Sequence, residues 1–133
     1  MEADADAADA IRALIARTYA AMSTPGSDFA EIFGHPDMTV AGSGAGELMD
    51  GPERVIAVAG AIAAQGRVWV PERVRVWRRG DVAWAQILGG VDLTESGGVV
   101  RVPYTTTRVF SLGADGWRWV YWGGAEPQES PRV

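Results

Sequence analysis

The chain has 133 residues, 47% of them hydrophobic, with a formal net charge of −5 and no cysteine. This length indicates one domain, and the missing cysteines exclude disulfides, a thiol nucleophile and thiolate metal ligands. Lysine is absent, which excludes Schiff-base chemistry, and the acidic balance disfavours nucleic acid as a partner. The longest apolar stretch, residues 55–64, is about half of a bilayer span, and the acidic N-terminus is unlike a signal peptide. We therefore expect a cytoplasmic protein that makes no membrane contact.

Two helices are predicted at the start of the chain. The first covers Ala7–Met22, because its apolar residues recur at helical spacing and aspartates lie near its start, where they favour the helix dipole. Residues 23–26 interrupt the pattern. Ser27 is then placed as the N-cap of a short second helix, which runs to Phe33 and ends at Gly34.

A short hairpin and a third helix are expected next. The hairpin pairs a strand at Asp37–Ala41 with one at Glu47–Met49 across a glycine-rich turn. The third helix covers Glu53–Ala64, because a proline stands in its first turn and apolar residues follow at helical spacing. Gly66 ends this helix.

Four long runs of alternating apolar residues make up the second half of the chain, with hairpin-like turns between them. They cover Arg67–Arg79, Asp81–Leu93, Val99–Leu112 and Gly116–Gly124. We predict an α+β fold in which three N-terminal helices pack in a strongly curved, mostly antiparallel sheet. Residues 1–125 are expected to form a single domain, and residues 126–133 a flexible C-terminal tail.

Strict alternation also assigns the side chains of these runs to faces. In the last run it puts Trp119 on the face opposite Trp122. In the first run it puts Arg73, Arg75 and Trp77 together on an outer face that is too aromatic for plain solvent surface. Because large exposed apolar patches mark interfaces, we expect a homodimer through this outer sheet face.

The order of elements resembles the cystatin-like cone of the nuclear transport factor 2-like superfamily, and within it the SnoaL-like domains. The resemblance covers nearly the whole chain and includes the segment 27–33, the turn 42–47 before Gly51, and the closing hairpin 115–118 with the aromatic run 119–122. It implies a cone with an aromatic-lined hydrophobic pocket. Members include polyketide cyclases, ketosteroid isomerases, dehydratases, epoxide hydrolases and non-catalytic modules.

The resemblance also implies catalytic positions at which this chain has other residues. Isomerase-type members carry an aspartate general base on the first short strand, where this chain has Ala41 or Gly42. Their acidic oxyanion donor corresponds to a position near Thr106. Many SnoaL-like members have a histidine and a serine after the last tryptophan strand, where residues 123–125 are Gly-Gly-Ala. These differences favour a binding module over the best-known chemistry of the family.

Four residues are candidates for catalysis. Arg108 lies on an apolar strand face, where a guanidinium must be paired or face a ligand; it could bind a carboxylate or polarise a carbonyl. His35 is the only histidine and could act as a general base at the pocket mouth. Asp37 and Glu47 flank the short hairpin, and a carboxylate with a pKa raised by burial is a workable base. The alternatives are a snorkelling or paired Arg108 and solvated surface carboxylates.

A second set of residues is expected to contact a hydrophobic small molecule: Tyr19, Trp84, Tyr104, Thr106 and Trp122. A tyrosine hydroxyl in an apolar pocket could donate to a developing enolate, although such aromatics could equally be ordinary core residues. No cofactor and no metal are expected, because the acidic residues lack the spacing of a calcium loop.

Three functional hypotheses follow from this sequence. The first is a cofactor-free cyclase, isomerase or hydrolase that acts on a polyketide- or terpenoid-like substrate. The second is a non-catalytic ligand-binding module, and the third is a dimerisation domain with a filled cavity. Fold analogy alone does not choose among them, so the question whether the protein is an enzyme stays open.

Overall fold

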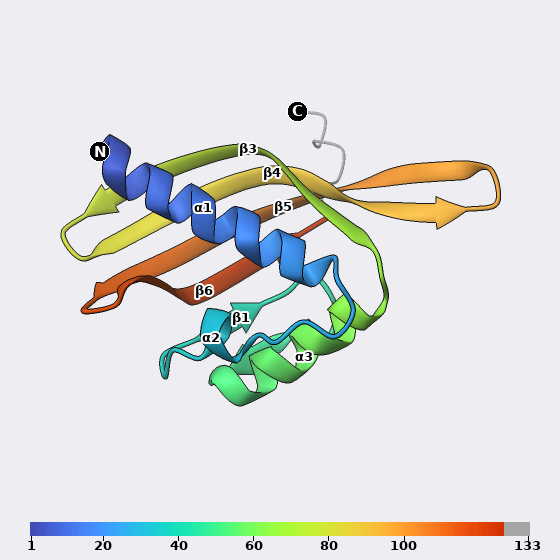
Figure 1. Cartoon of the computed structure of the whole chain (residues 1–133), viewed down its shortest axis with the longest axis horizontal. Helices are drawn as coiled ribbons and strands as arrows, with labels where there is room; N and C mark the ends of the chain where they lie inside the picture. Colours follow the sequence, from blue (N-terminus) through green and yellow to red (C-terminus); the bar gives the residue numbers. More distant parts are fainter. Residues whose placement is uncertain (127–133) are drawn as a thin grey trace, which may run out of the picture.

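The computed structural model describes residues 1–126, which form one six-stranded sheet with three helices packed against it (Figure 1). No helix within these residues has both the length and the apolar composition of a membrane span. Beyond Glu126, the tail predicted at residues 126–133 lies outside the described residues. The elements are α1 (Ala5–Met22), α2 (Ala30–Phe33), β1 (Thr39–Ala41), β2 (Leu48–Asp50), α3 (Pro52–Ala64), β3 (Val68–Arg79), β4 (Val82–Glu95), β5 (Gly98–Gly113) and β6 (Gly116–Ala125).

The sheet has the strand order β2-β1-β6-β5-β4-β3 and is curved and unclosed. All neighbouring strands are antiparallel except β1 and β6, which run parallel with Thr39 opposite Tyr121. We call the sheet face that packs against the helices the inner face and the opposite one the outer face. The predicted α+β fold is confirmed, because helices, short hairpin, third helix and four long strands follow in the predicted order.

Helix α1 lies along the inner face, where it crosses β3 (Figure 1). Its N-cap is Asp4, whose Oδ1 accepts a hydrogen bond from the Ala7 N–H at 2.8 Å. Ile11 and Ile15 follow at helical spacing and are buried. Burial of each isoleucine stabilises the fold by roughly 1.5–3 kcal/mol. The same stripe continues to Tyr19, which is therefore held against the sheet and is 2% exposed.

An extra residue in β6 turns two tryptophans toward the helices. The pairing of β6 with β5 shifts register between Trp119 and Tyr121, so that Val120 is the additional residue of a β-bulge. Trp119 and Trp122 are consequently both buried in the same core cluster. The prediction of opposite faces for these two residues was wrong, because strict alternation fails across a bulge.

A second bulge lies in β3, between Pro71 and Arg73. Proline has no N–H to donate to a sheet ladder, so a bulge is a common place for it. The residue opposite Pro71 on β4 is Gly89. A Cβ atom at position 89 would overlap the carbonyl oxygen of Val70. Glycine at this position therefore allows β4 to approach the bulged strand closely.

Gly89→Ala is expected to lower the free energy of unfolding by about 1–3 kcal/mol, because the added methyl group collides with the β3 backbone. The matched control is Gly60 in α3, where a Cβ would meet nothing within 4 Å. Gly60→Ala is expected to raise the free energy of unfolding by about 0.5–1 kcal/mol. Urea denaturation measures both variants. A Gly89→Ala protein as stable as the wild type would contradict this account of the bulge.

Candidate functional site

Two of the hollows among the described residues lie on opposite faces of the sheet. The hollow on the inner face, which we call the inner pocket, lies between α3, the β1–β2 hairpin and strands β5 and β6, and has a volume of about 50 Å³. The hollow on the outer face has a volume of about 740 Å³. A water molecule occupies about 30 Å³ in the liquid, and small-molecule sites occupy about 300–1,000 Å³. The aromatic side chains that were expected to line a large pocket therefore fill most of the space between the sheet and the helices.

Apolar side chains form most of the wall of the inner pocket. They are Met22, Phe33, Val40, Met49, Val55, Val58, Ala59, Ile62, Trp69 and Trp122. Two ionisable residues, Glu47 and Tyr104, complete the lining with Gly42. The indole Nε1 of Trp69 is buried and has no hydrogen-bond partner among residues 1–126. A buried donor without a partner is costly, so this wall offers a site for an acceptor atom.

Glu47 reaches the pocket from the turn between β1 and β2. Its carboxylate accepts a hydrogen bond from the Gly44 N–H at 3.0 Å, which holds the side chain across the turn. A Cβ atom built on Gly42 would overlap Glu47 Oε2. The carboxylate of Glu47 thus occupies the space that a side chain at position 42 would fill.

Tyr104 is the second ionisable residue of the pocket and packs edge-on against Trp69, with ring centroids 5.1 Å apart. Burial raises the pKa of Tyr104, and the negative charge of Glu47 acts in the same direction. The side chains of Trp122 and Ser43 and the charge of Arg108 oppose this rise in pKa. Tyr104 is therefore a neutral phenol at physiological pH and can donate a hydrogen bond into the pocket.

Arg108 lies behind this wall and is completely buried. Its Nη2 donates a hydrogen bond to the Tyr19 hydroxyl at 3.1 Å, and that hydroxyl lies 3.2 Å from Thr106 Oγ1. Nε and Nη1 have no hydrogen-bond partner in the described part of the chain. Burial lowers the pKa of Arg108 to about 9, although the nearby Tyr19 and Tyr104 oppose this shift. The guanidinium therefore remains charged at neutral pH.

Aromatic rings surround this cation. The guanidinium carbon lies over the ring of Trp122 and 5.0 Å from the ring centroid of Trp119. Trp119 is fixed in turn by a hydrogen bond from its Nε1 to Thr18 Oγ1, at 3.1 Å. Cation–π contacts of this kind stabilise a desolvated guanidinium by about 2 kcal/mol each. These contacts offset part of the cost of burying Arg108. They do not supply hydrogen-bond acceptors for the N–H groups on Nε and Nη1.

Some of the sequence candidates meet at this site and others do not. Tyr19, Thr106 and Arg108 form a connected cluster, and Glu47, Tyr104 and Trp122 line the adjacent pocket. His35 and Asp37 line neither hollow. They interact with each other, because the Asp37 N–H donates to His35 Nδ1 at 3.0 Å.

Trp69 lines the inner pocket, whereas Trp84, which the sequence suggested as a ligand contact, does not. Trp84, expected to contact a ligand, lies on the outer face, is 37% exposed and lines neither hollow. Trp69, which the sequence analysis did not select, lines the inner pocket. Pro71 could have indicated that Trp69 faces the inner pocket. A proline inside a strand indicates a bulge, and a bulge changes which residues point to each face.

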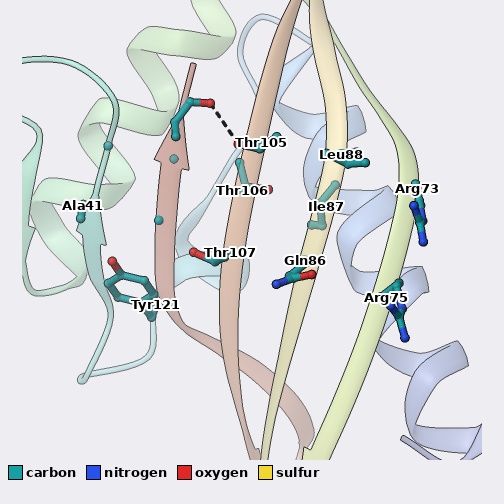
Figure 2. Close-up of a pocket in the computed structure, with 14 residues that line it drawn as sticks. Ala41, Arg73, Arg75, Gln86, Ile87, Leu88, Thr105, Thr106, Thr107 and Tyr121 are labelled. Carbon is teal, nitrogen blue, oxygen red and sulfur yellow. Dashed lines mark hydrogen bonds between the residues drawn. The ribbon is translucent and has the colours of Figure 1, made fainter. Parts of the chain in front are cut away.

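The outer hollow is broad and more polar (Figure 2). Arg73 and Arg75 extend from β3 at one side, and Tyr121 on β6 lies at the other. Side chains from β4 and β5 form the floor between them, namely Gln86, Leu88, Thr105 and Thr107. This hollow contains the two arginines that the sequence analysis placed on an outer sheet face.

Residues 11–127 match the family of the SnoaL-like domain, and the chain therefore belongs to this family. Solved structures show the same fold. An NTF2-like (nuclear transport factor 2-like) protein with a cystatin-like fold from Novosphingobium aromaticivorans is 21% identical, with a TM-score of 0.81 over 94% of this chain and 84% of that one. The CaMKII hub of S. rosetta is 20% identical, with a TM-score of 0.76 over 90% and 96%.

A third solved structure comes from an NTF2-like protein of Streptomyces avermitilis that is provisionally named a dehydratase. It is 16% identical, with a TM-score of 0.75 over 91% of this chain and 96% of that one. No protein of curated function matches the chain significantly in sequence. At these identities the solved structures establish the shared fold.

Proposed function

We propose that this SnoaL-like protein binds a small hydrophobic molecule in the inner pocket. The observation that carries the proposal is the Trp69 indole N–H on a mostly apolar wall, which is buried and has no hydrogen-bond partner among residues 1–126. A ligand with an apolar body and one acceptor oxygen would satisfy this donor and fill the pocket. Apolar surroundings strengthen such a hydrogen bond, and Tyr104 supplies a second donor on the same lining.

The size of the pocket limits the ligand. A volume of about 50 Å³ suits a fragment of a few heavy atoms. A polyketide- or terpenoid-sized molecule would require α3 and the β1–β2 hairpin to move away from the sheet. We therefore propose a short-chain ligand and treat larger ones as dependent on such an opening.

Binding is tested by titration with butyramide, monitored by NMR of the Trp69 indole N–H. This resonance is expected to shift downfield in the wild type. Ala59→Leu extends from α3 into the pocket and is expected to weaken binding at least tenfold, because its added carbons occupy the space that the ligand needs. The control is Ala57→Leu, on the exposed side of the same helix, which should bind normally. Equal binding by both variants would contradict the proposal.

A second candidate function is cofactor-free acid–base catalysis, and the position of Glu47 favours it. The resemblance to isomerase-type members implies a carboxylate on the first short strand, where this chain has Ala41 or Gly42. The carboxylate of Glu47 fills the space beside Gly42 from the neighbouring turn, and Tyr104 lies on the same lining as a neutral phenol. In this proposal Glu47 accepts a proton from carbon and Tyr104 donates a hydrogen bond to the developing enolate.

The catalytic candidate is tested with butanone in D₂O, where enolate formation exchanges the α-protons for deuterium. The protein is expected to accelerate this exchange, and Glu47→Gln to lose about 10²-fold or more, because a positioned base contributes that much. Asp37→Asn, which removes an exposed carboxylate outside the pocket, serves as the control and should exchange at the wild-type rate. Exchange by Glu47→Gln at the wild-type rate would refute a catalytic role for this carboxylate.

A homodimer through the outer face is the third part of the proposal. Strand β4 exposes three apolar side chains there, Val82 at 45%, Trp84 at 37% and Leu88 at 47%. Trp77 pairs with Trp84 across the adjacent strand, which extends the apolar strip. The S. rosetta relative is a hub. A second copy would cover this strip, since contiguous exposed apolar surface usually marks an interface.

Light scattering with size-exclusion chromatography tests the dimer. The wild type is expected to have the mass of two chains, and Leu88→Glu that of one, because two-fold symmetry brings a buried charge into the interface twice. Val99→Glu is the control, since Val99 is 67% exposed near the β4–β5 turn, away from the strip. A monomeric wild type, or two variants that behave alike, would rule this interface out.

A further inference from the structure

The carboxylate of Glu47 has acceptor positions to spare. Among the described residues that line the inner pocket, Glu47 is the one with a charged side chain. Within residues 1–126 its carboxylate accepts a single hydrogen bond, from the Gly44 N–H, and joins no ion pair. A carboxylate can accept about four hydrogen bonds. A ligand in this pocket therefore meets a negatively charged acceptor as well as apolar walls.

Two glycines on adjacent strands bring this carboxylate next to Tyr104. In the parallel pairing of β1 with β6, Gly42 and Gly124 come directly after the last pair that faces the inner pocket and the pair that follows it. A Cβ atom at Gly42 would overlap Glu47 Oε2, and one at Gly124 would overlap the Tyr104 hydroxyl. The two polar groups thus fill neighbouring spaces on strands that are roughly 4.8 Å apart.

The same wall carries a donor. The ring of Tyr104 packs edge-on against Trp69, so Tyr104 contacts Trp69 with its ring and lies beside Glu47 with its hydroxyl. The Trp69 indole N–H is buried and has no partner among residues 1–126. One wall of the inner pocket therefore combines an unused N–H donor with an acceptor that carries a negative charge.

We propose that the inner pocket recognises a primary carboxamide, so that its ligand is a short-chain aliphatic amide. The amide carbonyl accepts the hydrogen bond of the Trp69 N–H, and the amide nitrogen donates to the carboxylate of Glu47. The alkyl chain lies against α3, which contributes Val55, Ala59 and Ile62 to the lining. This inference rests on the proposed ligand-binding function and specifies the chemical class of the ligand.

Other polar groups of similar size match this wall less well. A ketone accepts from Trp69 but offers no donor to Glu47. A carboxylate has the same shortcoming and is repelled by the charge of Glu47. An ammonium group donates to Glu47 but leaves the Trp69 N–H without an acceptor, which is costly for a buried donor. An amide has its acceptor and its donors on adjacent atoms, and a hydrogen bond to a charged acceptor is among the stronger ones.

The experiment compares three compounds with the same alkyl chain: butyramide, 2-pentanone, in which a methyl group replaces the NH₂ group, and butyrate. Affinities are measured by NMR titration at pH 7. The wild type is expected to bind butyramide at least tenfold more tightly than 2-pentanone, and butyrate most weakly. Glu47→Met should bind butyramide and 2-pentanone equally within about twofold. Glu53→Met, the same substitution at an exposed position of α3 outside the lining, is the control and should keep the preference.

The outcomes separate this inference from the proposal on which it rests. If the wild type bound 2-pentanone as tightly as butyramide, the carboxamide would be overturned and the hydrophobic pocket would remain. If none of the three compounds bound, both ideas would fall. A preference for butyramide that survives in Glu47→Met, or that is also lost in Glu53→Met, would overturn the contact with Glu47. Should Glu47→Met not fold, the order of affinities in the wild type still decides.

Discussion

A guanidinium buried without a carboxylate determines how the rest of this protein is arranged. Arg108 is tolerated because aromatic rings from β6 and the hydroxyl of Tyr19 on α1 surround it. That arrangement requires α1 to lie against the inner face and Trp119 and Trp122 to point the same way along one strand. The bulge at Val120 provides the second requirement, since a regular strand would send one of the two rings outward. Thr18 then fixes Trp119 through its indole N–H.

The two faces of the sheet differ in the groups that they present. Among residues 1–126, the inner face has three buried nitrogens without a hydrogen-bond partner: the Trp69 indole Nε1 in the lining of the inner pocket, and Nε and Nη1 of Arg108 behind Trp122. A ligand in the inner pocket would supply the missing hydrogen bond of Trp69 rather than merely cover apolar surface, which favours small molecules with an oxygen acceptor. The outer face has the larger hollow and an exposed apolar strip on β4, which suits contact with another protein surface.

Most of the fold could be predicted from the sequence, because helical spacing, strand alternation and glycine-containing turns are local signals. The burial of Arg108 was also predictable, since Arg108 shares an apolar strand face with Thr106 and Phe110. The bulges were not, although Pro71 was a hint, and the bulge in β3 decided that Trp69 reached the pocket. The position of Glu47 in the pocket depends on a turn that folds its carboxylate over Gly42, a contact that residue spacing alone does not reveal.

The most direct test of the central claim is NMR of the Arg108 Nε–H group. A guanidinium buried in the core among aromatic rings predicts an Nε–H resonance that exchanges slowly with water at neutral pH. Rapid exchange of this hydrogen with water would contradict the claim that Arg108 is a buried cation.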